Sequence, residues 1–282
     1  MLYIRLAGGL GNQVFQLAAA MALRDARQER VLFGVRALGR YRAARALELT
    51  HFFDLPGWFE TCDACGAHGR IAEAVLRTRV GRLAPILGVS DRSFAARVVS
   101  RRRSFRVALV DGYFQRDWPT ETFDATRRGL MQMTVPGLSG SDGSGNYDCV
   151  LHIRGGDFLQ SPHSNVVGRS FYERAVHALR ETMDIRRIYV VTDDPAYARS
   201  ELVALAKGLA DLELVIPDAA TDMLSDFATI RHARCRIIGN STFSWWAAAL
   251  DPREAPTVAP MQWLRGLDRT LVLPWERLLA ID

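Results

Sequence analysis

The sequence predicts an α/β protein built from two doubly wound domains. Strand and helix patterns alternate regularly through the second half, and the first half opens with a strand, a glycine turn and a helix. Residues 137–146 are rich in Gly and Ser and carry no apolar pattern, as is typical of a linker. We therefore expect an N-terminal domain over residues 1–140 and a C-terminal domain over residues 147–282.

The composition is that of a globular protein. The chain has 282 residues, of which 49% are hydrophobic and 24% are charged, so it can bury one large or two medium cores. The sequence has no apolar run of about 18 residues, which excludes a membrane-spanning helix. A strand pattern begins at Leu2 and leaves no room for a signal peptide, so we expect a cytoplasmic protein.

The first strand leads into a glycine turn and a helix. The turn runs from Gly8 to Gly11, and the apolar spacing that follows predicts a helix beginning near Asn12. Gly9 and Gly11 let a ligand approach the backbone, and the start of a helix favours anions. The spacing differs from the Gly-x-Gly-x-x-Gly dinucleotide fingerprint. The rest of this half predicts two strands and an arginine-rich helical stretch, at residues 31–33, 108–110 and 70–106.

The second half predicts alternating strands and helices, and hence a parallel sheet. The expected strands are residues 150–153, 187–192, 212–216, 237–238 and 257–259. The expected helices are residues 171–183, 195–205, 223–232 and 243–250.

A charged cluster stands where the strand at residues 150–153 ends. His152, Arg154 and Asp157 lie around two glycines, at the end of a parallel strand where ligands of open α/β sheets bind. A guanidinium beside glycines can approach phosphate oxygens closely. The cluster indicates a phosphate-bearing ligand, with a salt-bridged loop as the alternative.

A similar layout recurs near the C-terminus, where a short strand leads into Gly239-Asn240-Ser241-Thr242 and an apolar helix. Ser241 and Thr242 can cap that helix and offer hydroxyl and N–H groups to a phosphate. We expect the adjacent Trp245 and Trp246 to be core residues that hold the helix against the sheet.

Together these segments resemble the inverting α-1,2-fucosyltransferases of glycosyltransferase family 11. The resemblance rests on residues 8–13, 152–157 and 240–246, with lesser matches in order at residues 112–115, 171–172 and 192–194. It implies a GT-B fold, in which two Rossmann-like domains face a cleft. Residues 1–140 would then form the acceptor-side domain, and residues 147–282 the domain that binds the nucleotide sugar. It also implies transfer of fucose from GDP-fucose to a glycan hydroxyl, expected to be the 2-hydroxyl of galactose. The family needs no metal, and no cofactor is implied beyond the donor substrate.

The resemblance also implies roles for individual residues. Arg154, Ser241 and Thr242 would hold the diphosphate, and His152 with Asp193 or Asp194 would contact guanine or ribose. Asp193 or Asp194 could instead cap the next helix. The donor site would also include Gly9, Gly11, Asn240 and Phe243.

The catalytic candidates are Arg154, Asp157 and Asn12. Asp157 could take the acceptor proton, or it could orient Arg154 or cap the next turn. Asp111, Asp117 and Glu121 are the alternative bases. The family pattern has a second Arg where this chain has Gly155, so a different nucleotide-sugar donor is one alternative function. A catalytically inactive nucleotide-sugar-binding protein is another.

Two other features suggest different functions. Cys62 and Cys65 form one Cys-x-x-Cys without a second pair, so we expect reduced thiols and no zinc site. The basic run at residues 101–103 could be a solvated helical face, a contact with anionic lipid on the inner side of a membrane, or a nucleic-acid site. Aromatic residues are sparse around it, so we expect no nucleic-acid partner.

Overall fold

The computed structural model divides the chain into two compact units, Met1–Val135 and Pro136–Asp282. It describes residues 2–27, 30–40, 45–62, 88–100, 108–138, 147–156, 159, 167–208, 211–264 and 267–281. Most of the expected linker, residues 139–146, lies outside this part, whereas Leu138 belongs to the second unit and is buried.

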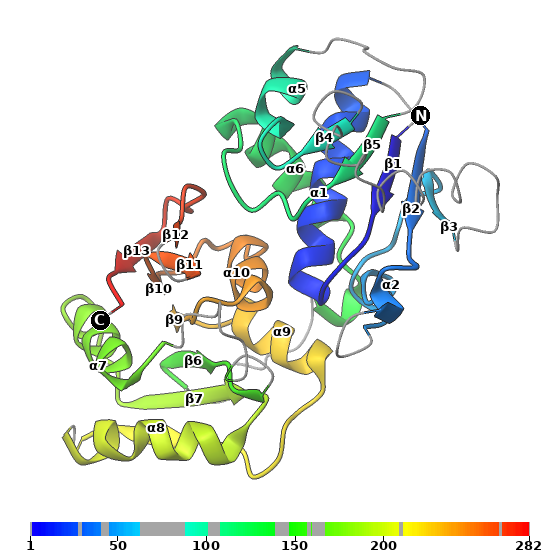
Figure 1. The fold of residues 1–282 in the computed structure, drawn as a ribbon. Coiled ribbons are helices and arrows are strands. Elements are labelled where there is room, and N and C mark those ends of the chain that lie inside the picture. Colours follow the sequence, from blue (N-terminus) through cyan, green and yellow to red (C-terminus); the bar gives the residue numbers. More distant parts are fainter. Residues whose placement is uncertain are drawn as a thin grey trace. The chain divides into compact units, whose positions relative to one another are not determined.

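The first unit holds a five-stranded parallel sheet with the strand order β3-β2-β1-β5-β4. Its strands are β1 (Leu2–Arg5), β2 (Val31–Gly34), β3 (Phe59–Cys62), β4 (Gly88–Ser90) and β5 (Ala108–Asp111). Its helices are α1 (Leu10–Arg27), the 3₁₀ turn η1 (Leu38–Arg40), α2 (Leu49–Phe52), α5 (Phe94–Ser100) and α6 (Thr120–Gln132). Figure 1 shows α1, α5 and α6 together on one face of the sheet.

Two expectations for this unit are corrected. Helix α1 begins at Leu10, two residues before Asn12, because Gly8 turns the chain with a φ of +80° and the N–H groups of Asn12 and Gln13 bond to the Gly9 carbonyl. The stretch at residues 70–106 is not one helical segment where it is described. It contains β4, which pairs with β5, and then the short helix α5. Pairing with a distant strand overrides the local helical pattern there.

The second unit holds a six-stranded parallel sheet with the order β13-β10-β9-β6-β7-β8. Its strands are β6 (Cys149–Ile153), β7 (Arg187–Thr192), β8 (Glu213–Val215), β9 (Arg236–Ile237), β10 (Thr257–Pro260) and β13 (Glu276–Leu279), with the antiparallel pair β11 (Gln262–Leu264) and β12 (Leu267–Asp268) beside it. Its helices are η3 (Pro136–Leu138), α7 (Arg169–Arg180), α8 (Pro195–Gly208), α9 (Met223–Arg231) and α10 (Thr242–Ala249).

Helices cover both faces of this second sheet. Figure 1 shows α7 and α8 on one face and α9 and α10 on the other. Every residue of β6 is buried, as expected for a central parallel strand covered on both sides. Trp245 and Trp246 of α10 are fully buried, so they are core residues as predicted. The expected strand at residues 257–259 is present as β10, but it does not end the sheet, because β13 follows it in the chain and pairs with it.

The predicted α/β class with two doubly wound domains is confirmed by these parallel sheets. Among the described residues, no helix combines the length and apolar character needed to cross a bilayer.

Candidate functional site

The loops that carry the predicted donor-site residues leave one edge of the second sheet. Strand β6 lies between β9 and β7, and all three are parallel. After β6 the chain adds β7 and then β8 on one side of that strand. It then adds β9, β10 and β13 on the other side, so the strand order reverses between β6 and β9. Ligands of open α/β sheets bind at such a switch point, beyond the carboxyl ends of the strands. The sheet therefore brings residues 154–156, 193–194 and 238–241 to the expected ligand edge.

Arg154 and Asp193 face each other across this edge. The Arg154 guanidinium lies 2.8 Å from the Asp193 carboxylate, and the two side chains are 29% and 30% exposed. The second oxygen of that carboxylate accepts the backbone N–H of Gly155 at 2.8 Å. Asp193 thus holds both the guanidinium and the loop backbone, while part of the Arg154 side chain stays open to solvent.

Gly155 is packed too tightly to carry a side chain. A Cβ atom placed there would lie 2.7 Å from Cβ of Asp194 and 3.2 Å from the ring of Tyr197. Cβ of Asp194 is fixed to the backbone at the start of α8, so it cannot swing aside as the tip of a flexible side chain could. The missing second Arg of the family pattern therefore coincides with a position where helix α8 approaches the loop.

His152 lies beneath the Arg154 loop as a neutral imidazole. It is 4% exposed, and burial, with a smaller contribution from the Arg154 charge, lowers its pKa to about 3. Its Nδ1 atom has no hydrogen-bond partner among the described residues. The ring centroid is 6.1 Å from that of Phe243 in α10. His152 can therefore act here as an uncharged hydrogen-bonding group.

The two aspartates after β7 have different partners. Asp194 Oδ1 accepts the N–H of Tyr197 at 3.0 Å, and Asp194 N donates to Thr192 Oγ1 at 3.1 Å. Asp194 thus caps the first turn of α8, which was the structural alternative for this pair. The Asp193 carboxylate faces Arg154 and the loop instead.

The start of α10 leaves backbone donors near the same edge. Ser241 occupies the N-cap position and is 8% exposed, but its side chain makes no capping hydrogen bond. Asn240 Nδ2 donates to the Trp263 carbonyl at 3.1 Å and fixes the preceding loop. Thr242 and Phe243 form the first turn and are half-buried. Uncapped N–H groups at a helix start suit an anionic ligand.

The remaining predicted residues lie in the first unit or outside the described part. Gly9, Gly11 and Asn12 are in the turn and first helical turn after β1. Asp157 is outside the described residues.

The alternative bases in the first unit differ in their surroundings. Asp111 accepts two hydrogen bonds from Arg5, each 2.9 Å long, so it is held as an ion-paired carboxylate. Asp117 and Glu121 are exposed.

Asp226 is a candidate that sequence reasoning missed. It lies in the first turn of α9, accepts a hydrogen bond from Thr221, and has its pKa raised to about 6, chiefly by burial and also by Asp222 and Asp193. Asp226 lies on α9, which packs against β6 and β7, the strands that lead to Arg154 and Asp193. Nothing in the local sequence brings it there, because the approach depends on how α9 packs over β6 and β7.

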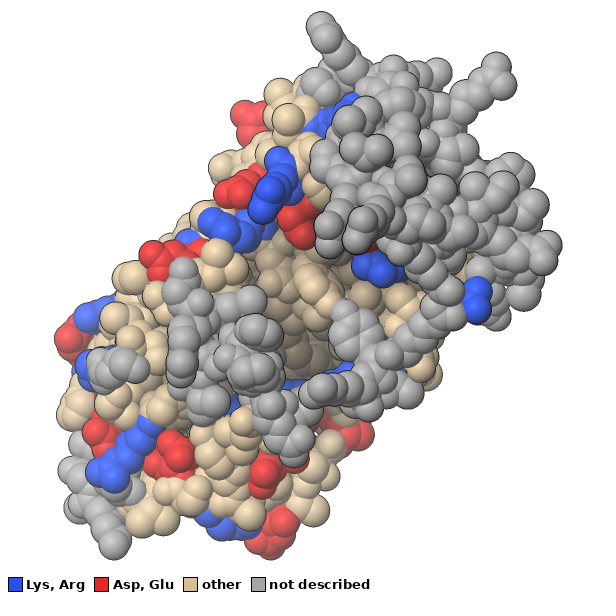
Figure 2. Space-filling view, in the orientation of Figure 1, with Lys and Arg blue, Asp and Glu red and all other residues tan. Residues whose placement is uncertain are grey.

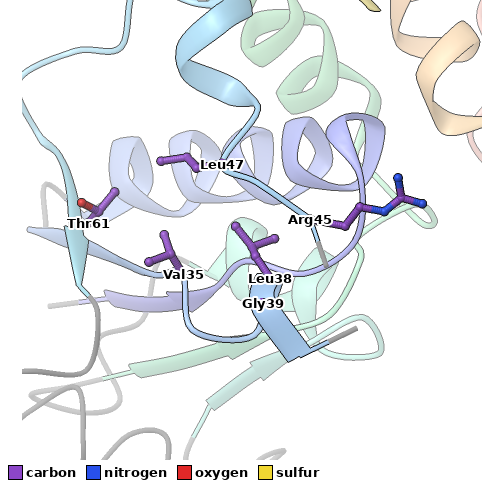
Figure 3. A pocket seen from close by; sticks show the side chains of 6 residues that line it. All are labelled: Val35, Leu38, Gly39, Arg45, Leu47 and Thr61. Atoms are coloured by element: carbon purple, nitrogen blue, oxygen red, sulfur yellow. The ribbon is translucent and has the colours of Figure 1, made fainter. Parts of the chain in front are cut away.

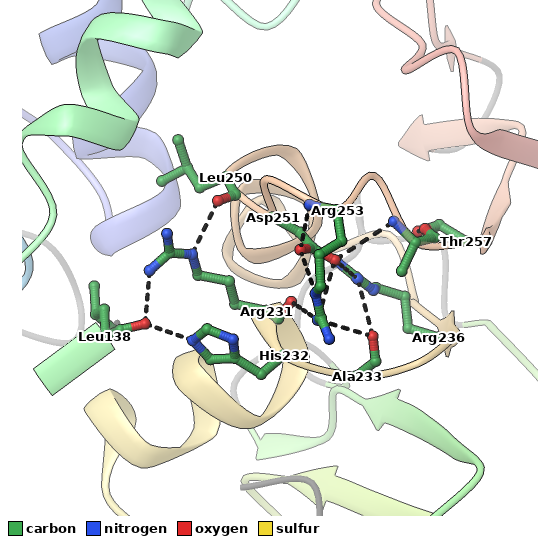
Figure 4. Close-up of polar contacts among 10 residues, drawn as sticks. Leu138, Arg231, His232, Ala233, Arg236, Leu250, Asp251, Arg253 and Thr257 are labelled. Carbon is green, nitrogen blue, oxygen red and sulfur yellow. Dashed lines mark hydrogen bonds and ion pairs between the residues drawn. The ribbon is translucent and has the colours of Figure 1, made fainter. Parts of the chain in front are cut away.

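A buried ionic network behind α10 has a structural role. Arg236 and Asp251 are both fully buried and form an ion pair, and Arg253 donates to the same carboxylate (Figure 4). Arg231 bonds the Leu250 and Leu138 carbonyls at 2.9 and 2.6 Å. The network joins β9, the end of α10 and η3, so it lies away from the start of α10.

Two pockets are lined by described residues, and neither lining includes a residue of the Arg154 edge. One, of about 250 Å³, is in the first unit (Figure 3) and is lined by Val35, Leu38, Gly39, Arg45, Leu47 and Thr61. The other follows α7 and is lined by Arg180, Thr182, Met183, Asp184, Ile185 and Asp211. Neither lining contains a residue that the sequence predicts for the donor site.

The described part of the chain offers no cluster of metal ligands, and charges of both signs mix on the face shown in Figure 2. No group of three or more His, Cys, Asp or Glu side chains there could hold a metal ion. On the face shown in Figure 2, described basic and acidic side chains are interspersed. The basic run at residues 101–103, and Cys65 of the Cys-x-x-Cys, lie outside the described residues.

Two known proteins resemble this chain in sequence, and a solved structure resembles it in fold. It is 23% identical over 276 residues to an alpha-1,2-colitosyltransferase of Escherichia coli, covering 92% of this chain and 91% of that protein. It is 28% identical over 125 residues to the O-antigen biosynthesis glycosyltransferase WbnK of Escherichia coli, covering 43% of this chain and 40% of that protein. The structure of POFUT1 in complex with GDP-fucose superimposes with a TM-score of 0.55 at 11% identity, covering 92% of this chain and 97% of that one.

The structural likeness supports the GT-B fold class, and the family assignment comes from the sequence. The model of glycosyl transferase family 11 matches residues 109–266, more than half of the chain, and spans the Arg154, Asp193 and Ser241 loops. With the ordered motifs and the switch-point geometry, this match shows that the chain is a glycosyltransferase belonging to family 11.

Proposed function

We propose that the protein transfers fucose from GDP-fucose to a glycan hydroxyl, expected to be the galactose 2-hydroxyl, with inversion at the anomeric carbon. The observation that carries this proposal is that Arg154 follows β6 while the start of α10 follows the neighbouring strand β9, so one switch point has both a guanidinium and a helix N-terminus. A cation and a set of backbone N–H donors at one edge suit a diphosphate. The solved POFUT1 structure of the same fold holds GDP-fucose.

The proposed reaction is a displacement at the sugar carbon. The acceptor oxygen forms a bond to the anomeric carbon while the bond to the diphosphate oxygen breaks, and the electron pair leaves with GDP. Arg154 and the N–H groups of Thr242 and Phe243 would stabilise the growing negative charge on the diphosphate. The acceptor proton passes to a base, for which Asp157 remains the proposed residue, with Asp117 and Glu121 as alternatives in the first unit. Asp111 is the weaker alternative because Arg5 already holds its carboxylate.

A second candidate donor is a colitosyl nucleotide. The relative that aligns along nearly the whole chain is named as a colitosyltransferase, and Gly155 departs from the fucosyltransferase pattern. A donor lacking one hydroxyl would need fewer polar contacts in the site.

A donor screen tests both candidates. Purified protein is incubated with GDP-fucose, GDP-colitose, GDP-mannose or UDP-galactose and a β-galactoside, with and without excess EDTA, and nucleoside diphosphate release is measured. We expect release from GDP-fucose that is undiminished by EDTA. Faster release from GDP-colitose would reassign the donor, and EDTA-sensitive activity restored by Mg²⁺ would contradict the metal-free mechanism. Binding of all donors without turnover would favour an inactive binding protein.

GDP is expected to protect the protein against thermal unfolding more than UDP or ADP at equal concentration. His152, Asp193 and Asp226 supply neutral and acidic groups that can read the guanine edge or the ribose. A tenfold affinity preference corresponds to about 1.4 kcal/mol of extra stabilisation when the sites are well filled. Equal shifts of the melting temperature for the three nucleotides would remove guanine selectivity.

Asp226 is expected to make GDP binding pH-dependent. We propose that its two carboxylate oxygens each accept a hydrogen bond from a guanine N–H group, an arrangement that needs the ionised form because protonation turns one oxygen into a donor. With a pKa of about 6, the carboxyl ionises as the pH rises through that value, so GDP affinity should increase between pH 5 and pH 7. Calorimetric titration should show this rise in the wild type and a flat profile in Asp226→Asn. An unchanged profile in the variant would assign the titration to another group.

Two statements about location remain proposals. The protein is proposed to act in the cytoplasm, and the basic run at residues 101–103 is proposed to contact anionic lipid on the inner membrane face. Sedimentation with anionic and neutral vesicles tests the second.

A further inference from the structure

The connection between β10 and β13 contains a buried ion pair. These two strands are parallel neighbours, and such strands are usually joined by a helix that packs on the sheet. The described residues between them include no helix and instead form the antiparallel pair β11 and β12. Arg269 follows β12 and Glu276 begins β13, and their side chains, 1% and 0% exposed, lie with nitrogen and oxygen 2.8 Å apart. The ion pair thus ties this connection to the strand at which it ends.

Arg269 also holds β11 in place. One terminal nitrogen of its guanidinium donates to both oxygens of Glu276, at 2.8 and 2.9 Å, and the other donates to the Pro260 carbonyl at 3.3 Å. The same guanidinium lies 4.6 Å from the centre of the Trp263 ring in β11. The backbone N–H of Arg269 donates to the Met261 carbonyl at 2.9 Å. These contacts fix Trp263, which is 4% exposed, relative to the end of β10.

Glu276 connects the ion pair to α10. Its Oε2 atom accepts the indole N–H of Trp245 at 3.3 Å and the backbone N–H of Leu273 at 2.8 Å. The Trp245 ring also packs edge-on against Trp263, with the ring centroids 6.1 Å apart. One carboxylate therefore binds both α10 and the segment that leads into β13.

Strand β11 in turn holds the loop before α10. The Trp263 carbonyl accepts a side-chain N–H of Asn240 at 3.1 Å, and Asn240 is 5% exposed. Asn240 directly precedes Ser241, the N-cap residue of α10, so fixing its side chain helps to fix the N–H groups of the first helical turn. A displacement of β11 would therefore move the backbone donors that the proposed function assigns to the diphosphate.

We propose that Arg269 and Glu276 are positioning residues for the donor diphosphate, which act through the Trp263 carbonyl and Asn240. Removing two charges from water is costly, so a buried ion pair is a weak source of stability, but its geometry is specific. Here that geometry fixes the strand that holds the Asn240 loop. The inference rests on the proposed diphosphate site, and it extends that site to side chains beyond residue 266, where the match to the family model ends.

The test is a cycle that combines the ion pair with Asn240. The ion-pair variant, Arg269→Met/Glu276→Gln, removes both charges together, and the Gln oxygen can still accept the two N–H groups that Glu276 Oε2 binds. This variant and Asn240→Ala are made separately and combined. Arg269→Lys is a milder second variant, since an ammonium keeps the charge but lacks the planar fork that reaches both Glu276 and the Pro260 carbonyl.

The affinity for GDP is measured by calorimetry, well below the melting temperature of every variant. The KM for GDP-fucose and for a β-galactoside is measured in parallel. Two controls lie in the same unit. Arg277→Ala removes an exposed ion pair between β13 and Glu181. Arg253→Met removes contacts of the buried network near the end of α10, so it controls for a general loss of stability.

We expect the ion-pair variant to raise the GDP dissociation constant and the KM for GDP-fucose by about fivefold to tenfold, the effect of misplaced hydrogen-bond donors. Arg269→Lys should show a smaller change in the same direction. Combined with Asn240→Ala, the ion-pair variant should add little, because it acts through Asn240. The galactoside KM should stay within about twofold of the wild type. Both controls should bind GDP as the wild type does, although Arg253→Met should melt at a lower temperature.

Additive effects in the cycle would overturn the inference, as would an unchanged GDP affinity in the ion-pair variant. An equal loss of GDP affinity in Arg253→Met would also overturn it, because general destabilisation would then explain the effect. Calorimetry with GDP needs no turnover, so the result stands even where the sugar or the acceptor differs from the proposed one. If the wild type prefers another nucleoside diphosphate, the proposed donor is wrong and the cycle is read with that nucleotide. If the ion-pair variant fails to fold, Arg269→Lys takes its place in the cycle, with the same outcomes deciding.

Discussion

Replacing Arg154 by Ala is expected to lower the rate of sugar transfer by at least about a hundredfold, the loss typical of removing one preorganised group that stabilises developing charge. Arg154 is the one guanidinium left from the family's pair, and it follows β6 at the switch point between β6 and β9. Its charge would be most useful when the diphosphate departs, so kcat should fall more than KM rises.

The fold should survive this substitution, because Arg154 is partly exposed and its partner Asp193 keeps its bond to Gly155 N. Circular dichroism and the melting temperature check this point. Arg169→Ala removes a more exposed arginine of the same unit, whose partner Glu173 lies four residues along α7, and should retain full activity. A rate for Arg154→Ala within about threefold of the wild type, less than 1 kcal/mol, would remove its assigned role.

Introducing the family's second arginine, Gly155→Arg, is expected to weaken GDP binding and reduce transfer more than tenfold. The added Cβ would meet Cβ of Asp194 at 2.7 Å, and relieving that overlap means moving the start of α8 or the Arg154 loop. Overpacking of this kind costs about 1–3 kcal/mol. A new guanidinium could return about 1.5–3 kcal/mol if its contact with the diphosphate were well formed. We expect loss because the displaced loop is the one that carries Arg154.

Gly155→Ala separates the two effects, since it adds the Cβ without the charge. Both variants should lose GDP affinity if the steric term dominates, as measured by calorimetry alongside transfer from GDP-fucose. If Gly155→Arg binds GDP more tightly than the wild type and transfers faster, Gly155 is a drifted position rather than an adaptation. That result would strengthen the case for a fucosyl donor.

Local patterns were sufficient for much of the architecture. The alternation of apolar strands and amphipathic helices predicted parallel α/β sheets. A strand that is buried on both faces appears in the sequence as a short apolar run, and the helix that covers it shows apolar residues with a period of 3.6. The ordered glycine, arginine and serine motifs pointed to family 11, which the family match over residues 109–266 confirms. Strands β3, β4, β11, β12 and β13 were not among the expected strands. Pairing with segments distant in the chain, rather than local propensity, makes β3, β4 and β13 strands.

The sequence by itself therefore determined the class of fold, the family and the loops that carry polar groups, because each of these depends on the types and spacing of residues that are close together in the chain. Only the tertiary structure decided which side chains meet. It separated Asp193, which faces Arg154, from Asp194, which caps α8. It also packed α9, which carries Asp226, against β6 and β7, brought Gln115 to Asn12, and closed the space at Gly155. The physical reason is that these side-chain contacts depend on strand order and on helix packing between segments far apart in the chain. Local periodicity carries no information about either.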